Sequence, residues 1–115
     1  MTAFSILLTT SPLANQDFAS ALQFSKTALR NGYKIEQVFL YQDAVLAAAE
    51  HIDLPADEIN LGRKLADYCK EFNIPLLYCV TAAEKRGLTQ VNSGFVAAGL
   101  AEFAMRLANS KLVQF

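Results

Sequence analysis

Cys79 is the residue of this 115-residue chain that is best placed to do chemistry. It ends the apolar run Ile74–Cys79, which is typical of a buried parallel strand. Small and helix-favouring residues follow over 82–86, and Gly87 stands where such a helix would end. A thiol at this junction would meet free backbone N–H groups and the positive end of a helix dipole. Both favour a nucleophilic thiolate.

Cys79 has a second interpretation, as a small apolar side chain packed inside a strand. Cysteine is among the most buried residue types, so the residue type alone favours packing. The position favours chemistry, because reactive groups in parallel α/β sheets gather beyond the carboxyl ends of the strands. Lys85 and Arg86 would either add positive potential there or form a solvated last turn. The residues by themselves leave both interpretations open.

The other chemistry-bearing residues give weaker signals. Cys69 shares a helical stripe with Leu65 and Phe72, which predicts a core position. His51, the only histidine, is expected to cap a helix or to be exposed. One histidine and two separated cysteines do not form a metal-ligand motif, so no metal is expected. The loop Thr10–Asn15 lacks glycine, which leaves flavodoxin-like binding of a nucleotide or flavin as a weak alternative.

The composition narrows the functional classes. Hydrophobic residues make up 53% of the chain, enough for one domain with a core. Ten basic and eleven acidic residues give a net charge of −1 without a basic block, so direct nucleic-acid binding is not expected. No segment resembles a membrane span or a leader, and we therefore expect a cytoplasmic protein whose cysteines stay reduced.

Hydrophobic periodicity and turn residues predict an alternating series of strands and helices. Strands are predicted over Phe4–Thr9, Lys34–Tyr41, Ile74–Cys79 and Lys111–Phe115. Helices are predicted from Phe18 (with Asn15 as cap) to Asn31, over Asp43–His51 (with Asp43 as cap), over Glu58–Phe72 and over Gly94–Ala108. Such alternation implies right-handed parallel crossovers. The prediction is an α/β fold with residues 1–115 in a single domain. This domain would be a three-layer sandwich with a mostly parallel sheet of four to five strands and helices on both faces.

The predicted helix over Gly94–Ala108 is apolar on nearly every side, and Glu102 and Arg106 are its only charged residues. One face of such a helix can pack on the sheet, but the other face also needs a cover. In so small a domain we expect that cover to be another subunit.

Several segments resemble the DsrE/TusD family of sulfur-relay proteins, and most closely its cysteine-bearing subunits. They are SILLTTSPLANQDFASALQF, VFLYQDAV, PLLYCVTAAEKRG, GFVAAGL and the terminal VQF, which together cover nearly the whole chain. The cysteine followed by a small-residue turn and Arg-Gly is the most specific part. The resemblance implies a persulfide sulfurtransferase in which Cys79 accepts sulfur as a persulfide, with no cofactor.

The resemblance also implies partners. These are TusB-like and TusC-like subunits in a hetero-oligomer, a TusA-like sulfur donor and a TusE-like acceptor, with 2-thiolation of the tRNA wobble uridine as the end of the relay. Relatives in the family also serve sulfur oxidation. The connection Leu88–Ser93 is predicted to be shorter than in the family, which would change how partners dock. A non-catalytic assembly subunit, with Cys79 as packing, is the alternative.

Overall fold

The computed structural model describes residues 2–12, 16–49, 60–88 and 90–115, and these form one five-stranded sheet. The strands are β1 (Ala3–Leu8), β2 (Lys34–Leu40), β3 (Leu76–Cys79), β4 (Val96–Ala98) and β5 (Lys111–Gln114). They lie in the order β4-β3-β2-β1-β5, and every neighbouring pair is parallel. The predicted α/β class is therefore confirmed, with a sheet that is parallel throughout.

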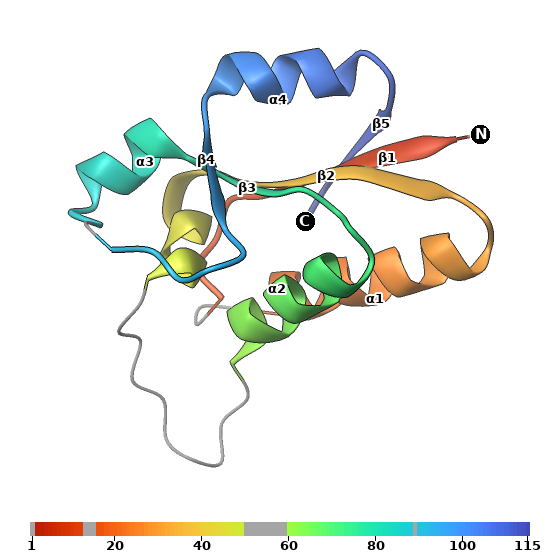
Figure 1. The fold of residues 1–115 in the computed structure, drawn as a ribbon, viewed down its shortest axis with the longest axis horizontal. Coiled ribbons are helices and arrows are strands. Elements are labelled where there is room, and N and C mark those ends of the chain that lie inside the picture. Colours follow the sequence, from red (N-terminus) through yellow and green to blue (C-terminus); the bar gives the residue numbers. More distant parts are fainter. Residues whose placement is uncertain (1, 13–15, 50–59, 89) are drawn as a thin grey trace.

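The helices lie on both faces and at one edge of this sheet (Figure 1). They are α1 (Asp17–Arg30), the 3₁₀ helix η1 (Gln42–Ala48), α2 (Leu61–Glu71), α3 (Val80–Lys85) and α4 (Leu100–Leu107). The helices α1 and α2 cover one face, and α4 lies on the other. In the part of the chain that the structure describes, no helix is long and apolar enough to cross a membrane.

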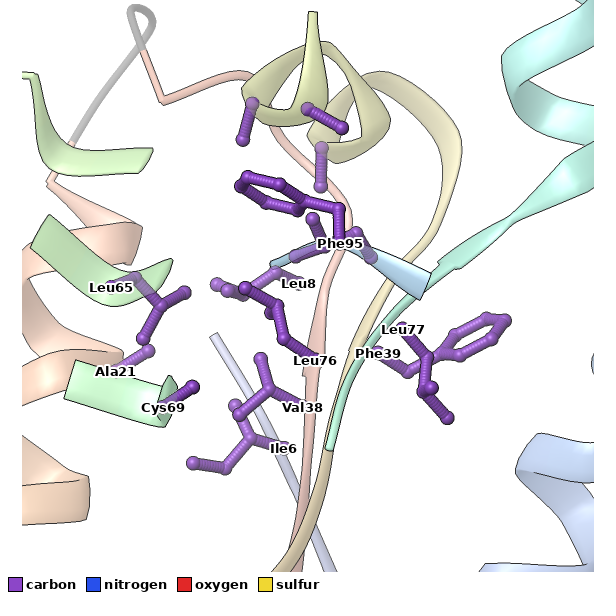
Figure 2. Packing of buried hydrophobic residues seen from close by; sticks show 14 of the residues in the cluster. Ile6, Leu8, Ala21, Val38, Phe39, Leu65, Cys69, Leu76, Leu77 and Phe95 are labelled. Atoms are coloured by element: carbon purple, nitrogen blue, oxygen red, sulfur yellow. The ribbon is translucent and has the colours of Figure 1, made fainter. Parts of the chain in front are cut away.

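The main apolar core lies between the sheet and the layer of α1 and α2. Side chains alternate along each strand, so that Val38 and Leu76 point toward α1 and α2 while Phe39 and Leu77 point toward α4 (Figure 2). The residues of this core are fully or nearly fully buried, among them Ile6, Leu8, Val38 and Leu76 of the sheet and Leu65 and Cys69 of α2. This burial on both faces of β2 and β3 explains their continuous apolar sequences.

The opposite face is built around Gln37, a buried polar residue. Its Nε2 donates hydrogen bonds to Ser5 Oγ at 3.0 Å and to the backbone oxygen of Phe103 in α4 at 3.2 Å. The ring of Phe103 stacks on that of Phe39, with centroids 4.6 Å apart. The amide of Gln37 and the stack of Phe103 on Phe39 thus attach α4 to the sheet, although no residue of α4 is buried.

The prediction of one helix over Gly94–Ala108 is wrong in its first part. Val96–Ala98 is the edge strand β4, in which Val96 pairs with Leu77 and Ala98 with Cys79. Pairing gives hydrogen-bond partners to the backbone groups along the edge of β3, which a helix at these positions would leave open. The helix α4 begins only after Gly99.

Two further helices differ from their predictions. Residues 42–48 form a 3₁₀ helix, whose N-cap is Tyr41 without a side-chain bond, so the prediction that Asp43 caps it is wrong. The structure describes α2 from Leu61, capped by Asn60, whose Oδ1 accepts a hydrogen bond from the N–H of Arg63 at 3.0 Å. The predicted cap Asn15 and the predicted position of His51 lie outside the described residues.

Replacing Phe39 with alanine should destabilise the fold by about 3–5 kcal/mol, because a fully buried ring is lost together with its stack on Phe103. Met105→Ala on α4 is the matched control. Its side chain is 74% exposed, so the expected change is within about 0.5 kcal/mol. Urea unfolding of both variants checks this, and equal losses would contradict the packing described for α4.

Candidate functional site

The carboxyl ends of β2, β3 and β4 meet at one edge of the sheet, because all the strands are parallel. Cys79 is the last residue of β3, with φ −71° and ψ 117°, and it is also the N-cap of α3. The strand passes into the helix without a connecting loop, since Val80 is already helical. The predicted strand-to-helix junction at Cys79 is thus confirmed, although the helix begins two residues earlier than predicted.

Small residues let α3 lie close to this edge. Ala82 and Ala83 are buried beneath it. The helix ends at Lys85, with Arg86 as its C-cap, and the next residue, Gly87, has a φ of 69° in the left-handed region that favours glycine. The N–H of Leu88 closes the turn by donating to the oxygen of Ala83 at 3.1 Å. The six-residue helix α3 therefore follows Cys79 directly, and its last turn has the basic residue Lys85.

A hollow of about 460 Å³ opens next to the thiol. Its walls come from β3, α3, the start of η1 and the start of α4, and they are formed by Tyr41, Gln42, Cys79, Thr81, Ala82, Lys85, Arg86 and Leu100. Tyr41 and Gln42 directly follow β2, and Leu100 opens α4. Cys79, Lys85 and Arg86 therefore line the same hollow, which is the first of the two arrangements considered for Lys85 and Arg86.

Arg86 connects two walls of this hollow. Its Nε donates to Asp43 Oδ1 of η1 at 2.8 Å, and its Nη1 donates to the oxygen of Ala82 at 3.0 Å. The Arg86 side chain is 28% exposed and that of Asp43 is 62% exposed, so water screens this ion pair. The hollow contains two cationic side chains, Lys85 and Arg86, and one of them is paired with a carboxylate.

The two cysteines occupy different surroundings, although each is only 2% exposed. Cys79 lines the hollow, whereas Cys69 belongs to the core under α2. Burial raises the pKa of the Cys69 thiol to about 12, which keeps it protonated at neutral pH. The prediction of a core role for Cys69 is confirmed.

The described residues of the loop Thr10–Asn15 do not line this hollow. Thr10 donates from its hydroxyl to Asp17 Oδ2 at 2.8 Å, which ties the loop after β1 to the start of α1. Residues 13–15 of that loop are outside the described part of the chain. Among the described residues, no three His, Cys, Asp or Glu side chains cluster as metal ligands.

Three residues that line the hollow, Tyr41, Gln42 and Leu100, were not identified from the sequence. Tyr41 and Gln42 directly follow β2, the strand next to β3, so their position in the chain contained a usable signal. Leu100 contained none, because its position depends on the edge strand β4 that the apolar run concealed.

The family model of the DsrE/DsrF-like family matches residues 2–115. The chain belongs to the DsrE/DsrF-like family. The sulfurtransferase TusD of Pectobacterium atrosepticum is 33% identical over 129 aligned positions that include all of both chains. Because this DsrE-like chain has 115 residues, that relative contains segments that are absent here.

Two further relatives broaden the comparison. A putative sulfurtransferase DsrE of Allochromatium vinosum is 31% identical over 85 positions, which cover 74% of this chain and 65% of that protein. The crystal structure of the YchN protein of E. coli matches with a TM-score of 0.82 and 22% identity over the whole of both chains. The family match and the similarity to TusD place the chain among the TusD/DsrE-like sulfurtransferases, and the YchN structure shows that the fold is shared.

Iodoacetamide should alkylate Cys79 faster than Cys69 in the native protein near neutral pH. Cys79 borders an open hollow, whereas Cys69 is buried and its raised pKa of about 12 keeps it protonated. Peptide mass mapping over time gives both rates. Equal rates are expected only after denaturation, and faster labelling of Cys69 in the native state would contradict this description.

Proposed function

We propose that Cys79 accepts sulfane sulfur as a persulfide and passes it to a thiol of a partner protein. The observation that carries the proposal is the position of Cys79, at the end of β3 and in the wall of a hollow shared with Lys85 and Arg86. Membership of a family with sulfurtransferase relatives supports this chemistry over simple packing of the thiol.

The transfer needs one nucleophilic displacement at each stage. The Cys79 thiolate attacks the outer sulfur of a donor persulfide, a new S–S bond forms, and the donor leaves as a thiolate. Any proton on the outer sulfur moves with it and can then dissociate to leave a persulfide anion, and no net oxidation or reduction occurs. An acceptor thiolate then attacks that outer sulfur and releases Cys79. The reaction requires neither a second cysteine in this chain nor a cofactor.

The surroundings of Cys79 suit such a relay. Because the thiol is only 2% exposed, a reacting sulfur must reach it through the 460 Å³ hollow. Lys85 and Arg86 stabilise the negative charge that the thiolate and the persulfide bear. Asp43 offsets part of this charge through its pair with Arg86.

The proposed partners follow from similarity to TusD. They are TusB-like and TusC-like subunits, a TusA-like donor and a TusE-like acceptor, all in the cytoplasm, with sulfur directed to 2-thiolation of the tRNA wobble uridine. A relay in sulfur oxidation is the second candidate, because a putative DsrE sulfurtransferase is also among the relatives. The exposed side of α4 is formed by Leu100, Ala101, Ala104 and Met105, and this apolar face would contact associated subunits.

The same face supports an alternative, a non-catalytic assembly subunit in which Cys79 only packs. Alkylation of Cys79 distinguishes the two functions. A thiol that stays unlabelled in the native protein and in its complexes would favour the assembly role.

Substituting Cys79 with serine should abolish sulfur uptake from a persulfidated donor protein, because serine provides no thiolate to form the S–S bond. Intact mass spectrometry measures uptake as a gain of one sulfur atom that dithiothreitol removes. Cys69→Ala is the matched control and should take up sulfur as the wild type does, since Cys69 lies in the core. A Cys79→Ser protein that still gains the labile sulfur would refute the proposal.

Lys85→Gln should slow sulfur uptake about threefold at low ionic strength, since one cation is removed from the hollow. The difference from the wild type should disappear in high salt, which screens the charge. Lys111→Gln, an exposed change on β5, is the control and should not alter the rate. If Lys85→Gln reacts like the wild type at low salt, the proposed electrostatic role of Lys85 is wrong.

A further inference from the structure

A second and larger hollow, of about 750 Å³, lies on the outer side of α1 and α2. It shares no residue with the hollow around Cys79. Its walls are formed by Leu22, Lys26, Leu29 and Arg30 of α1 and by Lys64, Asp67, Tyr68, Glu71 and Phe72, of which all but Phe72 lie within α2. We call it the α1–α2 groove.

The floor of the α1–α2 groove is apolar. Leu22 and Leu29 come from α1, while Tyr68 and Phe72 come from the α2 side. The rings of Tyr68 and Phe72 contact each other, with centroids 4.7 Å apart, and 49% of Phe72 is exposed. An aromatic side chain so open to water favours burial against another surface.

The two rims have opposite charge. Lys26 and Arg30 stand on α1, whereas Asp67 and Glu71 stand on α2. The charged residues of both rims lie near Tyr68, at the same position along the groove. Lys26 Nζ lies 5.9 Å from the ring centre of Tyr68. Burial raises the pKa of the Tyr68 phenol, Glu71 adds to this rise, and Arg30 lowers the pKa. Asp67 also has Arg63 at 3.9 Å, an exposed pair of little weight.

The direction of the helices makes this pattern self-complementary. Each of α1 and α2 precedes a strand of the same parallel sheet, on the same face, so the two helices run in the same direction (Figure 1). A twofold axis along the groove would therefore place α1 of one copy over α2 of the other. Lys26 and Arg30 would then meet Asp67 and Glu71 of the second copy, twice over. An axis across the groove would instead stack like charges.

We propose that the α1–α2 groove is a docking surface for a second copy of this chain, related by a twofold axis along the groove. The contact would bury the aromatic floor and form two symmetric sets of ion pairs. Lys64 leaves the groove with one cation in excess, three against two. So small an excess does not select a strongly acidic partner or a nucleic acid. This inference is independent of the sulfur chemistry at Cys79.

Charge reversal on each rim tests the proposal in the full chain. Lys26→Glu with Arg30→Glu makes both rims acidic, and Asp67→Lys with Glu71→Lys makes both basic. Analytical ultracentrifugation should give each double variant half the mass of the wild type at equal concentration, with association weakened about tenfold or more. An equimolar mixture should regain the wild-type mass, because the acidic rims of one variant then face the basic rims of the other.

Three controls make the result decisive. Lys70→Glu with Lys111→Glu changes as much charge outside the groove and should retain the wild-type mass. Phe72→Ser should weaken association without charge reversal, and Cys79→Ser should associate as the wild type does. Thermal melting confirms folding of each variant. A monomeric wild type, rim variants with unchanged mass, or a mixture that fails to reassociate would overturn the proposal.

Discussion

Parallel pairing on both sides of β3 holds Cys79 at the carboxyl edge of the sheet, beside the ends of β2 and β4. Since α3 begins at the next residue, no loop intervenes that could move the thiol relative to the sheet. The hollow, its cations and its walls all depend on this junction. The pairing partners of β3 are therefore as important for the site as the cysteine itself.

The two faces of the sheet are held by different interactions. Toward α1 and α2 the contacts are apolar, and Leu65, Val38 and Ile6 are fully buried. Toward α4 the attachment depends on Gln37, whose Oε1 has no hydrogen-bond partner among the described residues. A buried oxygen without a hydrogen-bond partner lowers the free energy of unfolding by about 1–3 kcal/mol. The helix that contributes Leu100 to the Cys79 hollow is thus the more weakly attached layer.

The order of elements could be predicted because buried parallel strands and amphipathic helices have distinct periods, and Cys79 marks the change between them. The strand β4 could not be predicted, since Val96, Ala97 and Ala98 suit a buried helix as well as a strand. For the same reason Leu100 was missed as a wall of the hollow. The near-complete burial of Cys79 also depends on tertiary packing, which residue types alone do not reveal.

Peptide mass mapping of the protein purified from its own cells, under conditions that protect persulfides, is the most direct test of a sulfur relay at Cys79. The relay predicts a fraction of the Cys79 peptide that is heavier by one sulfur atom, and dithiothreitol should remove this sulfur. The Cys69 peptide should be unmodified in the same sample. A labile sulfur on Cys69, or none on Cys79 while partner proteins in the sample hold persulfides, would contradict the relay.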